Sequence, residues 1–155
     1  MAYRFTWVFP ELLAGMACPG YFTALGADLD YLAEAGVKHI VTLTEFALDL
    51  PQEAPFVAHH LPIADFGAPD HEQTQRFCRL VDDATATRER VVVHCLAGIG
   101  RTGTMLAAYA IWRDGLTAAQ ALSFVRSRRP EYVQSVEQEA YLEDWEVWVK
   151  ATRTP

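Results

Sequence analysis

Residues 91–103, VVVHCLAGIGRTG, constrain the fold of this chain more than any other segment. Three consecutive valines show no polar alternation, which predicts a strand buried on both faces. Glycines follow at once, and the apolar spacing after them predicts a helix over residues 102–114. A strand, a glycine loop (residues 95–103) and a helix are typical of α/β proteins. Ligands in such proteins bind beyond the carboxyl ends of the parallel strands, so we expect the functional site at this loop.

The rest of the chain alternates between extended and helical patterns. Extended patterns cover residues 5–15, with a break at Pro10, then residues 38–45 and residues 56–63. Helical patterns cover residues 22–35, 70–88, 117–130 and 135–150. This alternation predicts an α/β fold, with a central, mostly parallel sheet of four to five strands flanked by helices. We find no linker or internal repeat, and therefore expect one domain over residues 1–155.

Composition narrows the functional classes. The net charge of −7 argues against nucleic acid as a general partner, because phosphate backbones bind basic surfaces. No apolar run approaches the roughly 20 residues of a membrane span, and no signal peptide is recognisable. The three cysteines are odd in number, which argues against a disulfide framework and for a reducing compartment. We expect a cytoplasmic monomer.

Two interpretations of the glycine loop explain only part of it. The simplest is a buried cysteine at the end of a strand, followed by a tight turn. A nucleotide loop is the second, because Gly98 to Gly103 fit the pattern G-x-G-x-x-G. The segments after it look helical, so the second strand with an acidic ribose partner is missing. The lysine of a mononucleotide P-loop is missing as well.

A third interpretation uses every residue of the loop. Successive backbone N–H groups between a strand and a helix can converge on one oxyanion, and the glycines allow the necessary dihedral angles. Arg101 adds a planar guanidinium that holds two phosphate oxygens at once. The same positive field would favour the thiolate of Cys95. The loop therefore predicts both a nucleophile and a binding site for the phosphoryl group it attacks.

HCLAGIGRTG resembles the signature loop of the protein tyrosine phosphatase superfamily, H-C-x-x-G-x-x-R-[ST], and the small chain is similar to the atypical dual-specificity phosphatases. WVFPELLAG, VTLTE, ADFGAPD and RRPEYVQSVEQEAYL resemble their counterparts in order and spacing. The resemblance implies a dual-specificity phosphatase-like fold. It also implies hydrolysis of phosphotyrosine through a phosphocysteine intermediate. Because the strands at 38–45 and 56–63 are separated by a short segment without a long insertion, we expect a shallow cleft that would also admit phosphoserine or phosphothreonine. No metal or other cofactor is expected.

The resemblance also implies roles for residues of the loop. Cys95 would be the nucleophile, and His94 would order the loop by hydrogen bonding instead of acting as a base. Thr102 would donate its hydroxyl to the departing thiolate, and we also expect it to cap the following helix. The substrate's phosphoryl group, or a similar oxyanion such as vanadate, would be bound by Leu96, Ala97, Gly98, Ile99, Gly100 and Arg101.

Residues outside the loop would complete the reaction. Asp65 and Asp70 both follow the strand at 56–63, and Asp70 with Gln73 fits a helix capping box. We therefore expect Asp65 to be the general acid. Gln134 and Gln138 have the Q-x3-Q spacing that orients the hydrolytic water in many relatives. The alternative is that both are polar residues near a helix start. Glu45 is expected near the loop, orienting a neighbouring side chain.

Two other functions stay open at this stage. Relatives that hydrolyse phosphoinositides or inositol phosphates often carry lysines inside the loop, whereas residues 96–100 here are uncharged. A non-catalytic phosphate-binding module would be favoured by a replaced Cys95, Arg101 or acid, and all are present. Phosphorylated proteins or peptides are therefore the expected partners. We expect no metal site, because His59 and His60 face opposite ways on a strand. The basic run at residues 126–129 is expected to be a solvated helix end.

Overall fold

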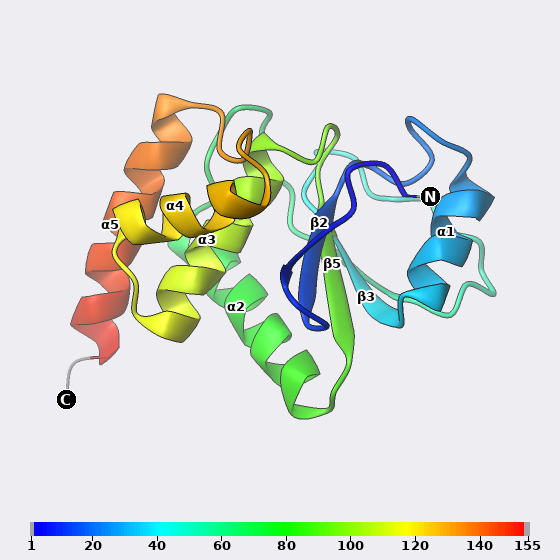
Figure 1. Ribbon diagram of the computed structural model, residues 1–155, viewed down its shortest axis with the longest axis horizontal. Coiled ribbons are helices and arrows are strands. Elements are labelled where there is room, and N and C mark those ends of the chain that lie inside the picture. Colours follow the sequence, from blue (N-terminus) through cyan, green and yellow to red (C-terminus); the bar gives the residue numbers. More distant parts are fainter. Residues whose placement is uncertain (1, 154–155) are drawn as a thin grey trace.

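The computed structural model describes residues 2–153, in which five strands form one sheet (Figure 1). The strands are β1 (Thr6–Phe9), β2 (Leu13–Met16), β3 (Val37–Thr42), β4 (Val57–His60) and β5 (Arg90–His94). Their order across the sheet is β1-β2-β5-β3-β4. Only the hairpin of β1 and β2 is antiparallel among these pairs; the other three pairs are parallel. The predicted α/β fold with a mostly parallel sheet is confirmed.

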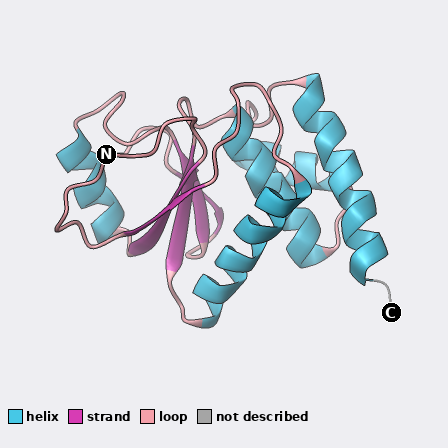
Figure 2. Cartoon of the chain, turned by 180° about the vertical axis from the view of Figure 1, so that it is seen from behind, coloured by secondary structure: helices cyan, strands magenta, loops and turns pink. Residues whose placement is uncertain are grey.

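Helices cover both faces of the sheet. They are α1 (Leu25–Glu34), α2 (His71–Ala86), α3 (Gly100–Asp114), α4 (Ala118–Arg128) and α5 (Val136–Arg153). Helix α1 lies alone on one face, and the other four helices gather on the opposite side, as Figures 1 and 2 show. None of the helices within residues 2–153 is both long enough and apolar enough to cross a membrane.

The central strand β5 explains why the valine run lacks alternation. Val91 and Val93 belong to the large core beneath α2 to α5, whereas Val92 packs in the smaller core beneath α1. All three side chains are fully buried. Because both faces of the strand are covered, each successive residue must be apolar. The buried strand carries the glycine loop at its carboxyl end, and β2 and β3 flank it on either side.

Helix starts agree with the sequence in some places and differ in others. The predicted capping box of Asp70 and Gln73 is present at the start of α2. Helix α1 begins at Leu25 and not at residue 22, because the backbone of Ala24 is extended. The prediction that Thr102 caps α3 is wrong: that helix begins at Gly100, so Thr102 already lies inside its first turn.

The basic run at the end of α4 is solvated at Arg128, as expected, whereas Arg126 and Arg129 are half-buried and bonded to the surrounding protein. Arg126 donates hydrogen bonds to the carbonyl oxygens of Tyr132 and Val133, both at 2.9 Å. Arg129 donates to Thr6 Oγ1 at 3.0 Å and so ties the end of α4 to β1. These bonds hold the segment between α4 and α5, which passes beside the glycine loop.

Candidate active site

The carbonyl groups of the glycine loop are bound by the surrounding protein. Leu96 O accepts a hydrogen bond from Cys18 N at 2.9 Å, and Ala97 O accepts one from Arg4 Nη1 at 2.9 Å. The backbone N–H groups of residues 96–101 have no acceptor within the part of the chain that the structure describes. Carbonyls turned outward leave these donors for an anion at the loop's centre, as in other anion-binding nests.

Gly98 has a backbone conformation that only glycine adopts without strain at this place. Its φ is +77°, in the left-handed region. A Cβ at this position would lie 2.5 Å from backbone atoms of Met16 and Ala17. Because backbone at the end of β2 cannot move aside like a flexible side chain, the loop requires glycine here. This close approach sets the position of the loop relative to the sheet.

Cys95 lies at the bottom of a small pocket of about 110 Å³ at the carboxyl edge of the sheet. Its residue is only 3% exposed, and its Sγ accepts a hydrogen bond from Thr102 Oγ1 at 3.1 Å. The lining residues of this pocket come from the glycine loop, from the segment after β4 and from the segment that precedes α5: Asp65, Phe66, Cys95, Leu96, Ala97, Gly100, Arg101 and Gln134. The structure thus brings the predicted nucleophile, acid and phosphate-binding residues together.

His94 is buried and neutral. Its Nδ1 lies 3.0 Å from Cys95 O, and because a carbonyl only accepts, Nδ1 carries the proton. Its Nε2 therefore accepts from Thr42 Oγ1, which lies 2.7 Å away. Burial lowers the pKa of His94 to about 4, and the nearby Arg101 guanidinium lowers it as well. With both nitrogens engaged, His94 orders the carbonyl of Cys95 and cannot serve as a base.

Arg101 is a buried cation with acceptors on three sides. Its Nη1 donates to Glu45 Oε1 at 2.8 Å and to Ile63 O at 3.0 Å, and its Nη2 lies 3.3 Å from Asp65 Oδ1. A buried charge is costly unless it is paired in this way. A hydrogen bond from its own backbone, followed by the bond from Arg101, lowers the pKa of Glu45. Glu45 thus orients the arginine, as the sequence suggested.

Asp65 lies on a loop that is held over the pocket. Its Oδ1 accepts a hydrogen bond from Phe66 N at 3.0 Å, and Phe66 has a left-handed φ of +61°. Ser135 Oγ donates to Phe66 O at 2.7 Å. The Asp65 side chain is 56% exposed, so a leaving group can reach it. Asp70, the competing candidate, is occupied in the capping box of α2.

The two glutamines occupy different environments. Gln134 lines the pocket, and its Oε1 would meet a Cβ on Gly100 at 2.6 Å. Gln138 is fully buried: its Oε1 accepts from Gln134 N at 2.8 Å, and its Nε2 donates to Gly67 O at 3.1 Å. Since both ends of the Gln138 amide are bonded, this residue positions the acid loop and the start of α5. Gln134 is the glutamine that faces the nucleophile.

Sequence reasoning missed three contributors to the site. Arg4 and Cys18 fix the carbonyls of the glycine loop from segments far away in sequence, and no local pattern indicates such contacts. Ser135 fixes the acid loop and accepts a hydrogen bond from Gln138 N at 3.1 Å. For Ser135 a signal exists, because Ser135 and Gln138 have the spacing of a capping box at the start of a helix.

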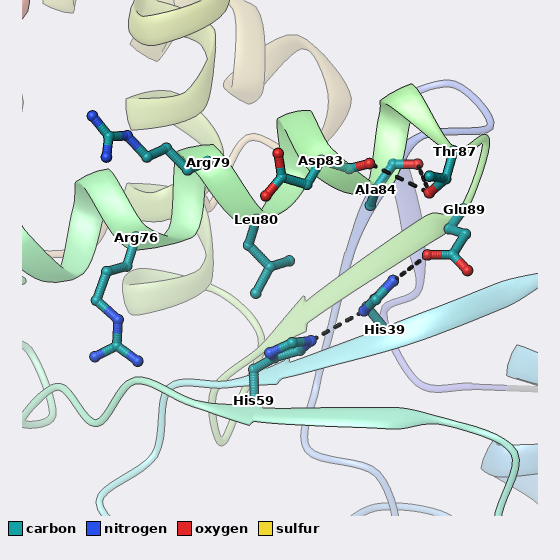
Figure 3. A pocket seen from close by; sticks show the side chains of 9 residues that line it. All are labelled: His39, His59, Arg76, Arg79, Leu80, Asp83, Ala84, Thr87 and Glu89. Carbon is teal, nitrogen blue, oxygen red and sulfur yellow. Dashed lines mark hydrogen bonds and ion pairs between the residues drawn. The ribbon is translucent and has the colours of Figure 1, made fainter.

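A larger cleft, of about 520 Å³, lies away from Cys95 between α2 and strands β3 and β4 (Figure 3). His39 connects two of its walls: Nδ1 lies 3.0 Å from His59 Nε2, and Nε2 lies 2.8 Å from Glu89 Oε1. His60, the next residue after His59, instead contacts Thr44 O. No cysteine is among the residues that line this cleft, and it shares no lining residue with the pocket of Cys95.

Residues 14–115 match the family model described as "Polymorphic toxin system, DSP-PTPase phosphatase". The chain is 31% identical over 150 residues to the tyrosine-protein phosphatase cdc-14 of Caenorhabditis elegans, covering 90% of this chain and 21% of that protein. It is 32% identical over 113 residues to the human dual specificity protein phosphatase CDC14C, covering 72% and 25%. It thus spans a quarter or less of these relatives.

Among solved structures, the active form of Tk-PTP superimposes with a TM-score of 0.82 at 27% sequence identity. This similarity covers 95% of the present chain and 99% of Tk-PTP.

Proposed function

Since this chain belongs to the DSP-PTPase phosphatase family, we propose that it hydrolyses phosphate monoesters on proteins through a phosphocysteine intermediate. One observation carries the proposal: free N–H groups and Arg101 surround the buried Sγ of Cys95, where a phosphoryl group would be held for attack. We assign the catalytic residues as Cys95, Arg101, Asp65, Thr102 and His94.

In the first step, Cys95 attacks the phosphorus atom as a thiolate. The S–P bond forms while the bond from phosphorus to the substrate oxygen breaks. The equatorial oxygens are held by the loop N–H groups and by Arg101, whose fixed donors stabilise the charge in the transition state. Asp65 gives its proton to the leaving oxygen, which departs as an alcohol or phenol. The position of Asp65 in the lining of the Cys95 pocket supports this assignment.

In the second step, water attacks phosphorus and the S–P bond breaks. Asp65, now a carboxylate, accepts a proton from that water, and inorganic phosphate forms. The sulfur leaves as a thiolate, which the hydroxyl of Thr102 stabilises by its hydrogen bond. We assign the positioning of the water to Gln134, because it lines the pocket. Gln138 supports it through the bond to the Gln134 backbone.

We propose phosphotyrosine as a substrate, with phosphoserine and phosphothreonine in addition. The segment between β3 and β4 spans residues 43–56 and contains no helix or strand that would form a deep wall. Residues 96–100 carry no charge to bind further phosphates of an inositol ring. The three cysteines are free and buried, which supports a reducing compartment, and we propose a cytoplasmic, monomeric enzyme in which residues 1–155 form one phosphatase domain.

The test is phosphate release from a matched panel of phosphotyrosine, phosphoserine and phosphothreonine peptides beside soluble inositol phosphates, with Cys95→Ser as the blank. Turnover of the peptides, lost in the blank, is the expected result. Turnover of inositol phosphates alone would change the substrate class and keep the catalytic assignments. If nothing is turned over, the pocket is a binding site and the proposal is wrong.

A further inference from the structure

All five exposed aromatic side chains within residues 2–153 lie at the edge of the sheet that carries Cys95. Tyr3 is held beside the end of β2, because its carbonyl accepts a hydrogen bond from Ala17 N at 3.0 Å. The others follow β2, β3 and β4 in sequence. We name these residues the aromatic rim; it consists of Tyr3, Tyr21, Phe22, Phe46 and Phe66, which are 37% to 60% exposed.

The rim includes packed rings and one ring inside the catalytic pocket. The rings of Tyr3 and Phe22 have centroids 4.5 Å apart, and those of Tyr21 and Phe22 are 4.9 Å apart. Phe66 lines the pocket of Cys95 itself. Scattered exposed apolar residues are normal, but a group of aromatic rings confined to the loops of one edge indicates a surface that binds something.

Part of the rim borders an apolar hollow of about 290 Å³. Its apolar wall is made by Tyr21, Leu25, Phe46 and Leu48. Two connections place the hollow beside the glycine loop. Cys18, which also lines it, donates its N–H to Leu96 O, and Phe46 directly follows Glu45, the partner of Arg101.

Charge around the hollow distinguishes between possible occupants. Asp49 lines it, and in the neighbouring catalytic pocket the carboxylates of Glu45 and Asp65 lie against Arg101. The whole chain carries a net charge of −7. An anionic membrane surface or a second phosphate group would be repelled by this edge. An apolar side chain of a peptide, near its phosphorylated residue, carries no charge and would not be repelled in this way.

We propose that the hollow binds a large apolar side chain of an extended phosphopeptide, within a few residues of the phosphorylated position. This inference rests on the proposed function, because the phosphoryl group must be held in the glycine loop at the same time. The bound apolar side chain would anchor the peptide beside the pocket. Transfer of a leucine side chain from water into such a site should raise kcat/KM roughly 10- to 100-fold.

The experiment compares seven phosphotyrosine peptides. One has glycine at all three positions on either side of the phosphotyrosine, and each of the other six has leucine in place of a different one of these glycines. The measured quantity is the ratio of kcat/KM for each leucine peptide to that of the all-glycine peptide. Phe46→Ala and Tyr21→Ala remove rings from the hollow; both are more than half exposed, so their effect on folding is small. Val147→Ala is the matched control, because Val147 is an exposed apolar residue on α5.

We expect a ratio of roughly 10 or more at one or two adjacent flanking positions, reduced about tenfold by Phe46→Ala or Tyr21→Ala and retained in Val147→Ala. Equal kcat/KM for all seven peptides in an active enzyme would overturn the inference and leave the proposed function intact. A ratio that both ring deletions leave unchanged would also overturn it. If vesicles of phosphatidylcholine and phosphatidylinositol phosphate bind the protein through Phe46 while leucine gives no gain, the rim is a lipid surface. If neither the peptides nor para-nitrophenyl phosphate is hydrolysed, the proposed function fails first and this inference fails with it.

Discussion

The hydroxyl of Thr102 donates a hydrogen bond to the sulfur of Cys95 at 3.1 Å, across the turn from β5 into α3. Both residues are buried, Thr102 completely. Because α3 begins at Gly100, the backbone of Thr102 belongs to the first turn of the helix, which fixes the position of its side chain beside Cys95. The contact joins the nucleophile to the first turn of α3.

Replacing Thr102 with valine keeps the shape of the side chain and removes the donor. The departing thiolate then loses a hydrogen bond to a charged group, so kcat should fall roughly 10- to 100-fold, with a smaller loss in kcat/KM. Stopped-flow kinetics with para-nitrophenyl phosphate should show a burst of product as phosphocysteine accumulates. Thr102→Ser should retain kcat. Equal losses in kcat and kcat/KM without a burst would contradict the assigned role.

Asp65→Asn removes the proton that the leaving group needs. For substrates with poor leaving groups, kcat should fall roughly 10²- to 10⁴-fold, and the alkaline limb of the pH–rate profile should disappear. Asp70→Asn is the matched comparison: it weakens the cap of α2 by about 1 kcal/mol or less and should not change the pH profile. If the alkaline limb were lost in Asp70→Asn instead, Asp70 and not Asp65 would be the general acid.

Gly98→Ala should damage the site without unfolding the protein. The new Cβ would lie 2.5 Å from the backbone at the end of β2, at a φ of +77°. Strain of about 1–3 kcal/mol would shift the loop, so vanadate affinity and kcat should each fall at least roughly tenfold. Gly26→Ala, on α1 with open space around it, is the control and should change neither. The measurement is a vanadate titration of both variants, and equal vanadate affinity in the two would contradict the prediction.

The buried His94 makes the stability of the fold depend on pH. Its pKa is about 4 in the folded chain against 6.5 as the ordinary value. The unfolded state therefore binds the proton first as the pH falls, and the contribution of neutral His94 is complete above 6.5 and lost between about 6.5 and 4. The free energy of unfolding should fall by about 3 kcal/mol over this range. Urea melts should show a smaller fall in His94→Asn; identical slopes would contradict the account.

The order of the helices and strands and the residues near Cys95 could be predicted from the sequence, because the patterns that indicate them are local. The valine run, the glycines and the Asp70 cap each depend on neighbouring residues alone. The same local reasoning placed Asp65 ahead of Asp70. Asp65 lines the pocket of Cys95, and its role as the acid stays a prediction.

Other features depend on packing between distant segments, which spacing does not encode. The two glutamines look equivalent in sequence, yet only Gln134 lines the pocket, because the acid loop at Gly67 takes the Gln138 amide. The wrong prediction that Thr102 caps α3 has a similar cause. The helix starts inside the glycine loop, and no side chain caps its first N–H groups. The hydrogen bonds from Arg126 to the carbonyls of Tyr132 and Val133 also became visible only with the fold.

The central claim is that Cys95 carries the phosphoryl group during turnover. The most direct measurement is rapid acid quenching of the Thr102→Val variant with a phosphotyrosine peptide, followed by mass spectrometry of its proteolytic fragments. The account predicts one phosphoryl group on the fragment that contains Cys95, and none when Cys95 is serine. Turnover with no phosphoryl group on that fragment, or turnover retained in Cys95→Ser, would contradict it.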